Sequence, residues 1–184
     1  MAEKSSASSL GDGAEVSSVV SIRPARTSDV AAMVDLIAPL VDRRVLLGKE
    51  RVTLFESIQE FVVAEARDTG EVVGCGALHV MWEDLAEVRT LAVREDWLHR
   101  GVGSLLLTTL LGRAADLGVH RVFCLTFETE FFTKHGFTVV REPPVDPVVY
   151  AELLRSQDEG VAEFLELARV KQNTLGNTRM IIHF

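Results

Sequence analysis

The chain has 184 residues, of which 47% are hydrophobic and 25% charged, and its formal net charge is −8 at pH 7. This composition is typical of a soluble globular protein and excludes disordered and collagen-like chains, while the length suits one domain with a sizeable core. The negative charge argues against nucleic acid as the main partner, because binding to a phosphate backbone favours a basic surface.

Residues 1–17 are polar and rich in Ser and Gly, which predicts a mobile tail ahead of a folded domain at 18–184. The apolar runs are far shorter than the ~20 residues of a membrane span, and the N-terminus lacks the apolar core of a secretion signal. We therefore expect a cytoplasmic protein with no membrane partner.

The hydrophobic spacing predicts alternating strands and helices, which indicates an α/β protein of one domain. In chain order we expect a strand at 19–23, a helix at 29–38, a loop at 40–49, a helix at 52–59 and a hairpin of strands at 61–66 and 71–80. A strand at 87–93, a helix at 101–117 that ends at Gly118, and a strand at 121–126 follow. The remaining expected elements are a helix at 128–134, a strand at 137–141, a helix at 148–155 and a final strand at 178–184, with 164–170 unassigned.

Two cysteines, Cys75 and Cys124, lie in apolar, strand-like surroundings. Their spacing is not that of metal ligands, and we expect two buried free thiols rather than a disulfide. The sequence therefore predicts no metal site.

The stretch 86–117 carries the pattern with the clearest chemistry, a strand, a short loop and two glycines that open a helix. Gly101 and Gly103 allow close approach of the backbone to a ligand, and the amides at a helix N-terminus suit a pyrophosphate. The alternative is a tight turn without a ligand. The pattern is neither a Rossmann fingerprint, because Leu106 replaces its third glycine, nor a P-loop, which requires Gly-Lys-Ser/Thr.

This stretch, together with the segment FFTKHGF at 131–137, resembles the acetyl-CoA-dependent acyltransferases of the GNAT family. The resemblance implies a single-domain α/β GNAT fold, with a mixed, mostly antiparallel central sheet flanked by helices, and acetyl-CoA as co-substrate. Leu98 departs from the Gln or Arg of the family's loop pattern, and Phe132 stands where many members carry a tyrosine that protonates the thiolate. The cofactor residues that the resemblance implies are Leu91, Ala92, Val93, Leu98, His99, Arg100, Gly101, Val102, Gly103, Ser104, Phe131 and Phe132.

The resemblance also implies direct attack of an amine on the thioester, which requires a base. Glu87, at the start of the strand at 87–93, stands where related enzymes carry a base or a carboxylate that holds water; alternatively it pairs with Arg89, two residues along the same face. Thr126 is a candidate hydrogen-bond donor to the thiolate or to a water, with a purely structural strand residue as the alternative.

Five segments, 37–50, 72–80, 86–93, 122–137 and 176–184, are most similar to the acyltransferase domain of bacterial N-acetylglutamate synthases, especially their short, stand-alone form. The resemblance implies transfer of acetyl to the α-amine of L-glutamate at the start of arginine biosynthesis. Glutamine, another amino acid, a peptide N-terminus and a non-catalytic acyl-CoA sensor stay open as alternatives, as does a homodimer. The residues expected at the acceptor are Leu46, Leu47, Lys49, Arg89, Thr90, Asn177, Thr178 and Arg179.

Overall fold

The computed structural model describes residues 16–141, 145–158, 161–162, 165 and 176–184. The strands are β1 (Val20–Pro24), β2 (Phe61–Ala66), β3 (Val72–Trp82), β4 (Leu85–Val93), β5 (Arg121–Thr126), β6 (Thr138–Val139) and β7 (Thr178–His183). The α-helices are α2 (Val30–Asp42), α3 (Arg51–Glu56), α4 (Val102–Asp116), α5 (Thr129–Lys134) and α6 (Pro147–Leu153), with 3-10 turns at Thr27–Asp29, Ile58–Glu60 and Glu95–Trp97.

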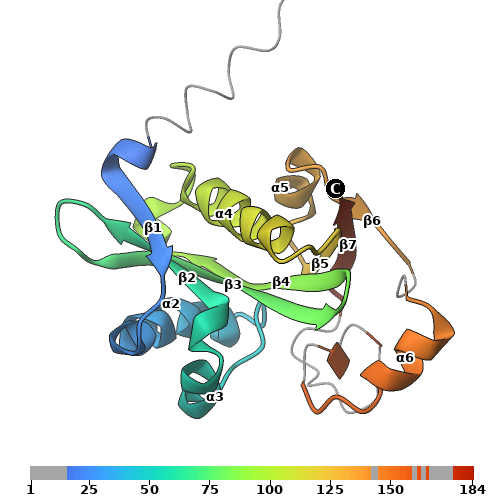
Figure 1. Cartoon of the computed structure of the whole chain (residues 1–184). Helices are drawn as coiled ribbons and strands as arrows, with labels where there is room; N and C mark the ends of the chain where they lie inside the picture. The colour runs from blue at the N-terminus through green and yellow to red at the C-terminus, as the bar shows by residue number, and fades with distance from the viewer. Residues whose placement is uncertain (1–15, 142–144, 159–160, 163–164, 166–175) are drawn as a thin grey trace, which may run out of the picture.

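The strands of the described chain form one sheet in the order β1-β2-β3-β4-β5-β7-β6. Neighbouring strands are antiparallel except for β4 and β5, which are parallel. Helices α2 and α3 cover one face of the sheet, and α4 covers the other (Figure 1). The predicted α/β architecture, a mixed and mostly antiparallel sheet flanked by helices, is confirmed.

Side-chain alternation explains why β2 is buried on both faces. Val62 and Ala64 join the core cluster beneath α4, whereas Phe61 and Val63 join the cluster beneath α2. Because successive side chains of a strand point to opposite faces, a central strand covered by helices on both sides reads as a continuous apolar run.

Helix α4 packs on the sheet through residues spaced four apart, as the sequence predicted. Val102, Leu106, Leu110 and Ala114 are all buried in the same core cluster. The chain leaves the helix through Gly118, whose φ of 78° is the left-handed conformation that glycine adopts most readily.

Several predicted boundaries were wrong. Helix α2 does not end before Pro39 but continues to Asp42 with Pro39 inside it, because Leu40 and Val41 pack against the core. The helix expected at 52–59 ends at Glu56 and is followed by a 3-10 turn. The strand expected at 137–141 pairs with β7 at only two residues, because it lies at the edge of the sheet.

The described part of the chain begins two residues before the predicted boundary at 18. Residues 16–19 form a helical turn, and Val16 is buried in the core beneath α4. Residues 1–15 of the predicted tail and most of the unassigned stretch 164–170 lie outside the described residues. Among the described helices, none is long and apolar enough to cross a membrane.

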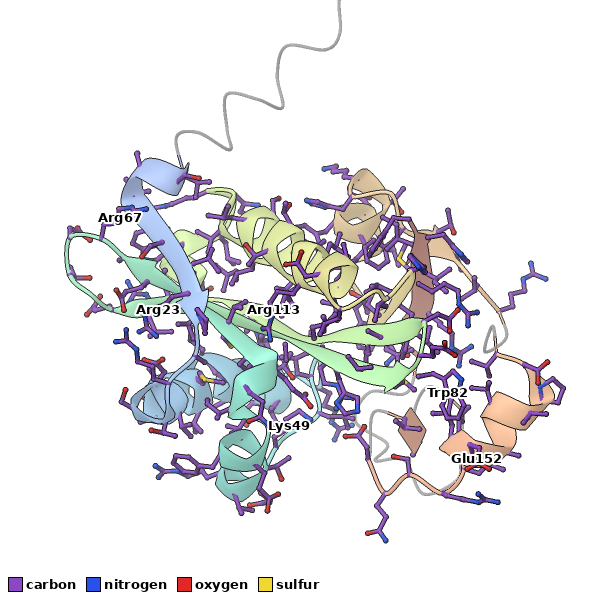
Figure 2. All side chains as sticks on the ribbon, viewed as in Figure 1. Arg23, Lys49, Arg67, Trp82, Arg113 and Glu152 are labelled. Carbon is purple, nitrogen blue, oxygen red and sulfur yellow. The ribbon has the colours of Figure 1, made fainter. Side chains whose placement is uncertain are left out.

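The segment that contains α6 packs against the end of the sheet farthest from α2. Leu153, Val161 and Leu165 form a cluster with Leu85 and Phe123. Trp82, at the end of β3, packs against this cluster, and Figure 2 shows it close to α6. This packing brings α6, Val161 and Leu165 towards the start of β4 and β5.

Candidate active site

Strands β4 and β5 separate after a short parallel stretch. Only three residues of each strand pair, and the last pair is Glu87 with Phe123. Beyond this point β4 stays paired with β3 and β5 with β7, so the two strands diverge. In the described sheet the backbone groups of 88–93 that face β5 have no strand partner, and they are open to pairing with an extended ligand.

A bulge in β4 contributes to this separation. Ala77 of β3 pairs with Arg89 and Cys75 with Ala92, so two residues of β4 lie opposite Gly76 alone. One of them, Thr90, has a φ of 56°, which is uncommon for a residue with a side chain. Bulges bend a strand and increase its twist.

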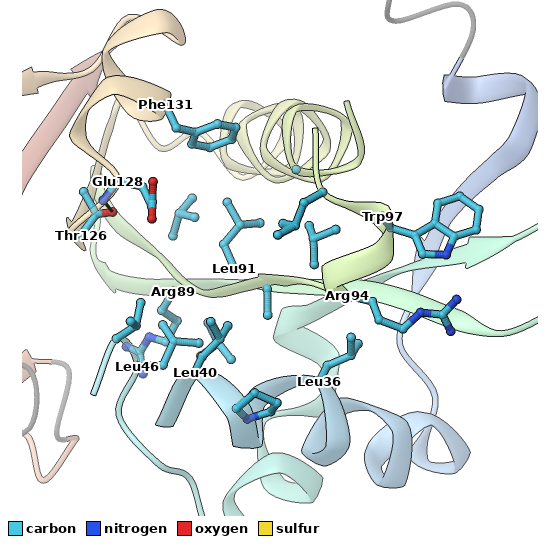
Figure 3. A pocket seen from close by; sticks show the side chains of 18 of the residues that line it. Leu36, Leu40, Leu46, Arg89, Leu91, Arg94, Trp97, Thr126, Glu128 and Phe131 are labelled. Carbon is cyan, nitrogen blue, oxygen red and sulfur yellow. Dashed lines mark hydrogen bonds between the residues drawn. The ribbon is translucent and has the colours of Figure 1, made fainter. Parts of the chain in front are cut away.

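A cavity of about 1360 Å³ occupies the opening between the strands (Figure 3). Its walls come from α2, the loop after α2, β4, the loop before α4, the end of β5 and α5. Most of the predicted site residues line it, namely Leu46, Leu47, Lys49, Glu87, Arg89, Thr90, Leu91, Ala92, Val93, Leu98, His99, Gly101, Gly103, Ser104, Thr126, Phe131, Phe132 and Asn177.

The loop before α4 presents backbone amides to one end of this cavity. Gly101 is the residue before the helix and has a φ of 82°, while His99 also has a positive φ of 59°. The amide of Leu105 makes the first intrahelical bond, to Gly101 O at 3.0 Å, so the amides at 102–104 precede the helical ladder. Their donors and the positive end of a 15-residue helix suit a pyrophosphate.

Two residues expected at the cofactor, Arg100 and Val102, do not line the cavity. The Val102 side chain is buried between α4 and the sheet, so only its amide faces the start of the helix, and Arg100 stacks over Trp97 at 5.2 Å. Leu98 lines the cavity, but its amide already donates to the carbonyl of Glu95 at 3.2 Å. Trp97 does line the cavity, and no spacing in the sequence pointed to that position.

Glu87 and Arg89 form a buried ion pair where the strands begin to separate. Arg89 Nε lies 2.9 Å from Glu87 Oε2, out of line for a hydrogen bond, and both side chains are less than 10% exposed. Arg89 Nη1 donates to Asp158 Oδ2 at 2.9 Å. Burial alone lowers the pKa of Arg89, but the charges of the two carboxylates raise it overall, so the guanidinium stays positive.

Lys49 lines the same part of the cavity from the loop after α2, as Figure 2 shows beside α3. Burial lowers the pKa of Lys49, and the positive charge of Arg89 lowers it further. The carboxylates of Asp158 and Glu87 act in the opposite direction, but the pKa stays below its usual value. Lys49 and Arg89 therefore belong to one cluster of charged side chains, in which the carboxylates of Glu87, Asp158 and Glu60 oppose the two cations.

Thr126 lies at the end of β5, across the opening from β4. Its Oγ1 accepts a hydrogen bond from the amide of Glu128 at 2.9 Å, which leaves the hydroxyl proton available to another partner (Figure 3). Phe132 carries no hydroxyl and packs edge-to-face on Phe131, with ring centroids 5.1 Å apart. Phe131 in turn lies against Gly103, 3.6 Å from where a Cβ there would stand.

Of the three C-terminal residues expected at the acceptor, one lines the cavity and two do not. Asn177 lines the cavity, whereas Thr178 and Arg179 do not. Thr178 pairs with Thr126 in the sheet, and Arg179 Nη1 donates to the carbonyl of Arg141 at 3.1 Å from a buried position. Arg179 therefore lies in the sheet next to the site rather than in its wall.

Asp158 was missed because it stands 69 residues from Arg89 in the sequence and in a segment with no assignable pattern. The only local signal is Ser156, whose hydroxyl accepts from the Asp158 amide, an arrangement typical of turns. Cys75 and Cys124 are buried free thiols, as expected. In the part of the chain that the structure describes, no group of three His, Cys, Asp or Glu side chains is arranged to hold a metal.

Comparison with known proteins identifies relatives of this chain. Residues 39–137 match the acetyltransferase (GNAT) family. An amino-acid acetyltransferase of Mycobacterium tuberculosis is 52% identical over 162 residues, which cover 88% of this chain and 92% of the relative. An amino-acid acetyltransferase of Shewanella oneidensis is 38% identical over 64% of this chain, which spans only 26% of that longer protein.

Solved structures show the same architecture. A crystal structure from Mycobacterium tuberculosis in complex with CoA and NLQ superposes with a TM-score of 0.86 at 52% identity, covering 89% of this chain and 99% of that one. N-acetylglutamate synthase from Neisseria gonorrhoeae, complexed with coenzyme A and N-acetyl-glutamate, gives a TM-score of 0.71 at 26% identity, covering 89% of this chain and 35% of the synthase.

Proposed function

This chain belongs to the acetyltransferase (GNAT) family. We propose that it transfers the acetyl group of acetyl-CoA to the α-amine of an amino acid, with L-glutamate as the first candidate acceptor. The observation that carries the proposal is the cavity, which joins a helix N-terminus suited to pyrophosphate to a buried cluster of charged side chains. Relatives named amino-acid acetyltransferase support it.

The residues present fit acetyl-CoA. Amides at 102–104 provide donors for the pyrophosphate, and the open edge of β4 at 88–93 provides donors and acceptors for the amide groups of the pantetheine arm. Gly103, at the start of the helix, lies against the ring of Phe131. Acetyl-CoA supplies the activated thioester, and the protein supplies binding, proton transfer and orientation.

The proton of the acceptor amine goes to Glu87 in this proposal. An ammonium group cannot attack, so a base must remove its proton directly or through a water. Glu87 lines the cavity at the point where β4 and β5 part, and the ion pair with Arg89 holds its carboxylate there. As the new C–N bond forms and the C–S bond breaks, the departing thiolate takes a proton or hydrogen bond, and we assign Thr126, in the wall of the cavity, as the donor.

Lys49 and Arg89 are the cations that face the acceptor, and we assign them to its carboxylates. Leu46, Leu47, Thr90 and Asn177 complete this wall. The product, N-acetyl-L-glutamate, is the compound with which arginine biosynthesis begins in this proposal.

A second acceptor is favoured by the charge balance of the same wall. The carboxylates of Glu87, Asp158 and Glu60 already oppose the charges of Arg89 and Lys49, so the cluster has no surplus positive charge by formal count. An acceptor with an uncharged side chain, such as L-glutamine, needs no surplus positive charge. The ratio of kcat/KM for L-glutamate and L-glutamine decides between the two.

The proposal is tested by incubating the protein with acetyl-CoA and each acceptor and identifying the acetylated product by mass spectrometry. Acetylation of the α-amine of glutamate or glutamine supports it. If only peptide N-termini are acetylated, the acceptor is a peptide and not a free amino acid. Tight acetyl-CoA binding without any product indicates a non-catalytic sensor.

A further inference from the structure

Asp158 connects a distant segment of the chain to the acceptor wall of the cavity. Its Oδ2 accepts a hydrogen bond of 2.9 Å from Arg89 Nη1, although 69 residues separate the two in the sequence. The side chain of Arg89 is 8% exposed and that of Asp158 28%. A charge-assisted bond in such a setting holds the geometry of both partners more strongly than a surface pair does.

The carboxylate of Asp158 is itself held in place. Its Oδ1 accepts from the amide of Val161 at 2.9 Å, and its own amide donates to Ser156 Oγ at 3.2 Å. Val161 is buried against the end of the sheet. Burial alone raises the pKa of Asp158, but the charge and hydrogen bond of Arg89, together with the Val161 amide, lower it to about 2. The group is therefore a carboxylate at neutral pH.

Arg89 is oriented from two sides and keeps one nitrogen without an acceptor. Glu87 lies against Nε and Asp158 binds Nη1. Nη2 is buried and has no hydrogen-bond acceptor among the described residues. A buried donor of this kind is costly unless a partner completes it, and Arg89 lines the cavity beside Leu46 (Figure 3).

We propose that Asp158 is a positioning residue, which fixes the guanidinium of Arg89 so that Nη2 receives a carboxylate of the amino-acid acceptor. This inference rests on the proposed function, because it gives Arg89 an amino acid to bind. Asp158 acts through Arg89 and does not contact the reacting atoms.

The alternative role for Asp158 is to neutralise Arg89, and it predicts an effect of opposite sign. If Asp158 only reduced the positive charge of the site, its removal would strengthen attraction for a carboxylate and lower the KM for L-glutamate. If Asp158 holds Arg89 in place, its removal raises the KM for glutamate and glutamine alike, because both carry the α-carboxylate.

The test compares Asp158→Asn with Asp146→Asn, a matched control. Asp146 caps the start of α6 through the amide of Val148 at 2.8 Å, so the control removes the same charge from a similar cap in the same segment. We expect Asp158→Asn to raise the acceptor KM about tenfold, with the KM for acetyl-CoA unchanged, and Asp146→Asn to change neither. An unchanged or lowered acceptor KM in Asp158→Asn, or an equal rise in the control, overturns the proposal.

A second variant separates positioning from folding. Asp158→Ser retains a hydroxyl that caps the Val161 turn but is too short to reach Arg89. We expect it to keep the melting temperature of the unaltered chain and to show the same rise in acceptor KM. A normal acceptor KM in a folded Asp158→Ser protein overturns the proposal.

A readout that does not depend on turnover distinguishes this inference from the proposed function. In ¹⁵N-arginine NMR spectra, with the Arg89 signals identified by their loss in Arg89→Lys, slow exchange of its side-chain protons is expected to disappear in Asp158→Asn and to persist in Asp146→Asn. If no amino acid is acetylated, the proposed function fails, and persistent slow exchange in Asp158→Asn rejects the positioning role independently.

Discussion

Glu87 and Arg89 stand two residues apart on β4, with Arg89 Nε 2.9 Å from Glu87 Oε2, at the last point where β4 and β5 still pair. Side chains at this spacing share one face of a strand. The ion pair with Arg89, which the sequence offered as the alternative to a catalytic role for Glu87, is therefore present. The ion pair is compatible with a role of Glu87 as base, because both side chains lie in the wall of the cavity and not in a closed core.

Replacement of Glu87 by glutamine tests that role. We expect kcat to fall about 10²-fold, because general-base catalysis contributes on this order, with little change in the KM for acetyl-CoA. Glu83→Gln, at the exposed turn between β3 and β4, is the control and is expected to leave kcat unchanged. An unaltered kcat for Glu87→Gln across the pH range would remove Glu87 from the mechanism.

Two glycines of the same region are expected to respond to alanine in opposite ways. Gly101 has a φ of 82°, so Gly101→Ala strains the loop and displaces the amides at the start of α4. The KM for acetyl-CoA is expected to rise about tenfold, since misplaced donors weaken binding of the pyrophosphate.

Gly112 provides the matched comparison. It lies inside α4, and a Cβ there would meet no heavy atom within 4 Å. Gly112→Ala is expected to stabilise the protein by about 0.5–1 kcal/mol and to leave the KM for acetyl-CoA unchanged. Thermal unfolding and initial rates on both variants check the pair; equal kinetic effects would show that the left-handed turn at Gly101 is not required.

Lys49 is expected to bind an acceptor carboxylate. Lys49→Gln removes a charge-assisted contact, and we expect the KM for L-glutamate to rise about tenfold, corresponding to about 1.4 kcal/mol. If Lys49 faces the side-chain carboxylate, the rise is larger for glutamate than for glutamine. Equal rises for both assign Lys49 to the α-carboxylate, and no rise for either places the carboxylate site elsewhere.

Asp29 is expected to make the stability of the fold depend on pH. Its side chain accepts two hydrogen bonds from Arg23, at 2.7 and 3.0 Å, and one from the Arg26 amide. These bonds, led by that from Arg23, lower the pKa of Asp29 despite burial. Because the unfolded state, with a pKa of about 3.9, binds the proton more readily, this stabilisation is complete above about pH 5 and is lost as pH falls through the lower folded pKa.

Asp29→Asn measures that contribution. The free energy of unfolding at pH 7 is expected to fall by about 1–3 kcal/mol, and the difference from the unaltered chain to shrink as the pH is lowered below about 4. Urea unfolding at several pH values checks this. A difference that stays constant down to pH 2 would contradict the assignment.

The sequence predicted the elements whose pattern is local. The strands expected at 61–66 and 121–126 coincide with β2 and β5, and the face of α4 follows from residues four apart. Boundaries failed where tertiary packing overrides a local signal, as at Pro39, where contacts of α2 with the core extend the helix.

The site was predictable as far as its signals were contiguous. Glu87 and the two glycines at the start of α4 lie in one stretch of sequence, and the structure places them in one cavity. The contact of Asp158 with Arg89 depends on how α6 docks on the end of the sheet, which no spacing encodes. The positive charge of Arg179 made it a candidate to bind an acceptor carboxylate. Arg179 instead lies within β7, paired with Leu125 of β5, so it is part of the sheet and not of the cavity wall.

Release of the CoA thiol from acetyl-CoA, followed with a thiol-reactive dye against each of the twenty amino acids, tests the central claim most directly. We predict saturable turnover with L-glutamate or L-glutamine, well above that with every other amino acid. Absence of turnover with all twenty, from a protein that binds acetyl-CoA, would contradict the assignment as an amino-acid acetyltransferase.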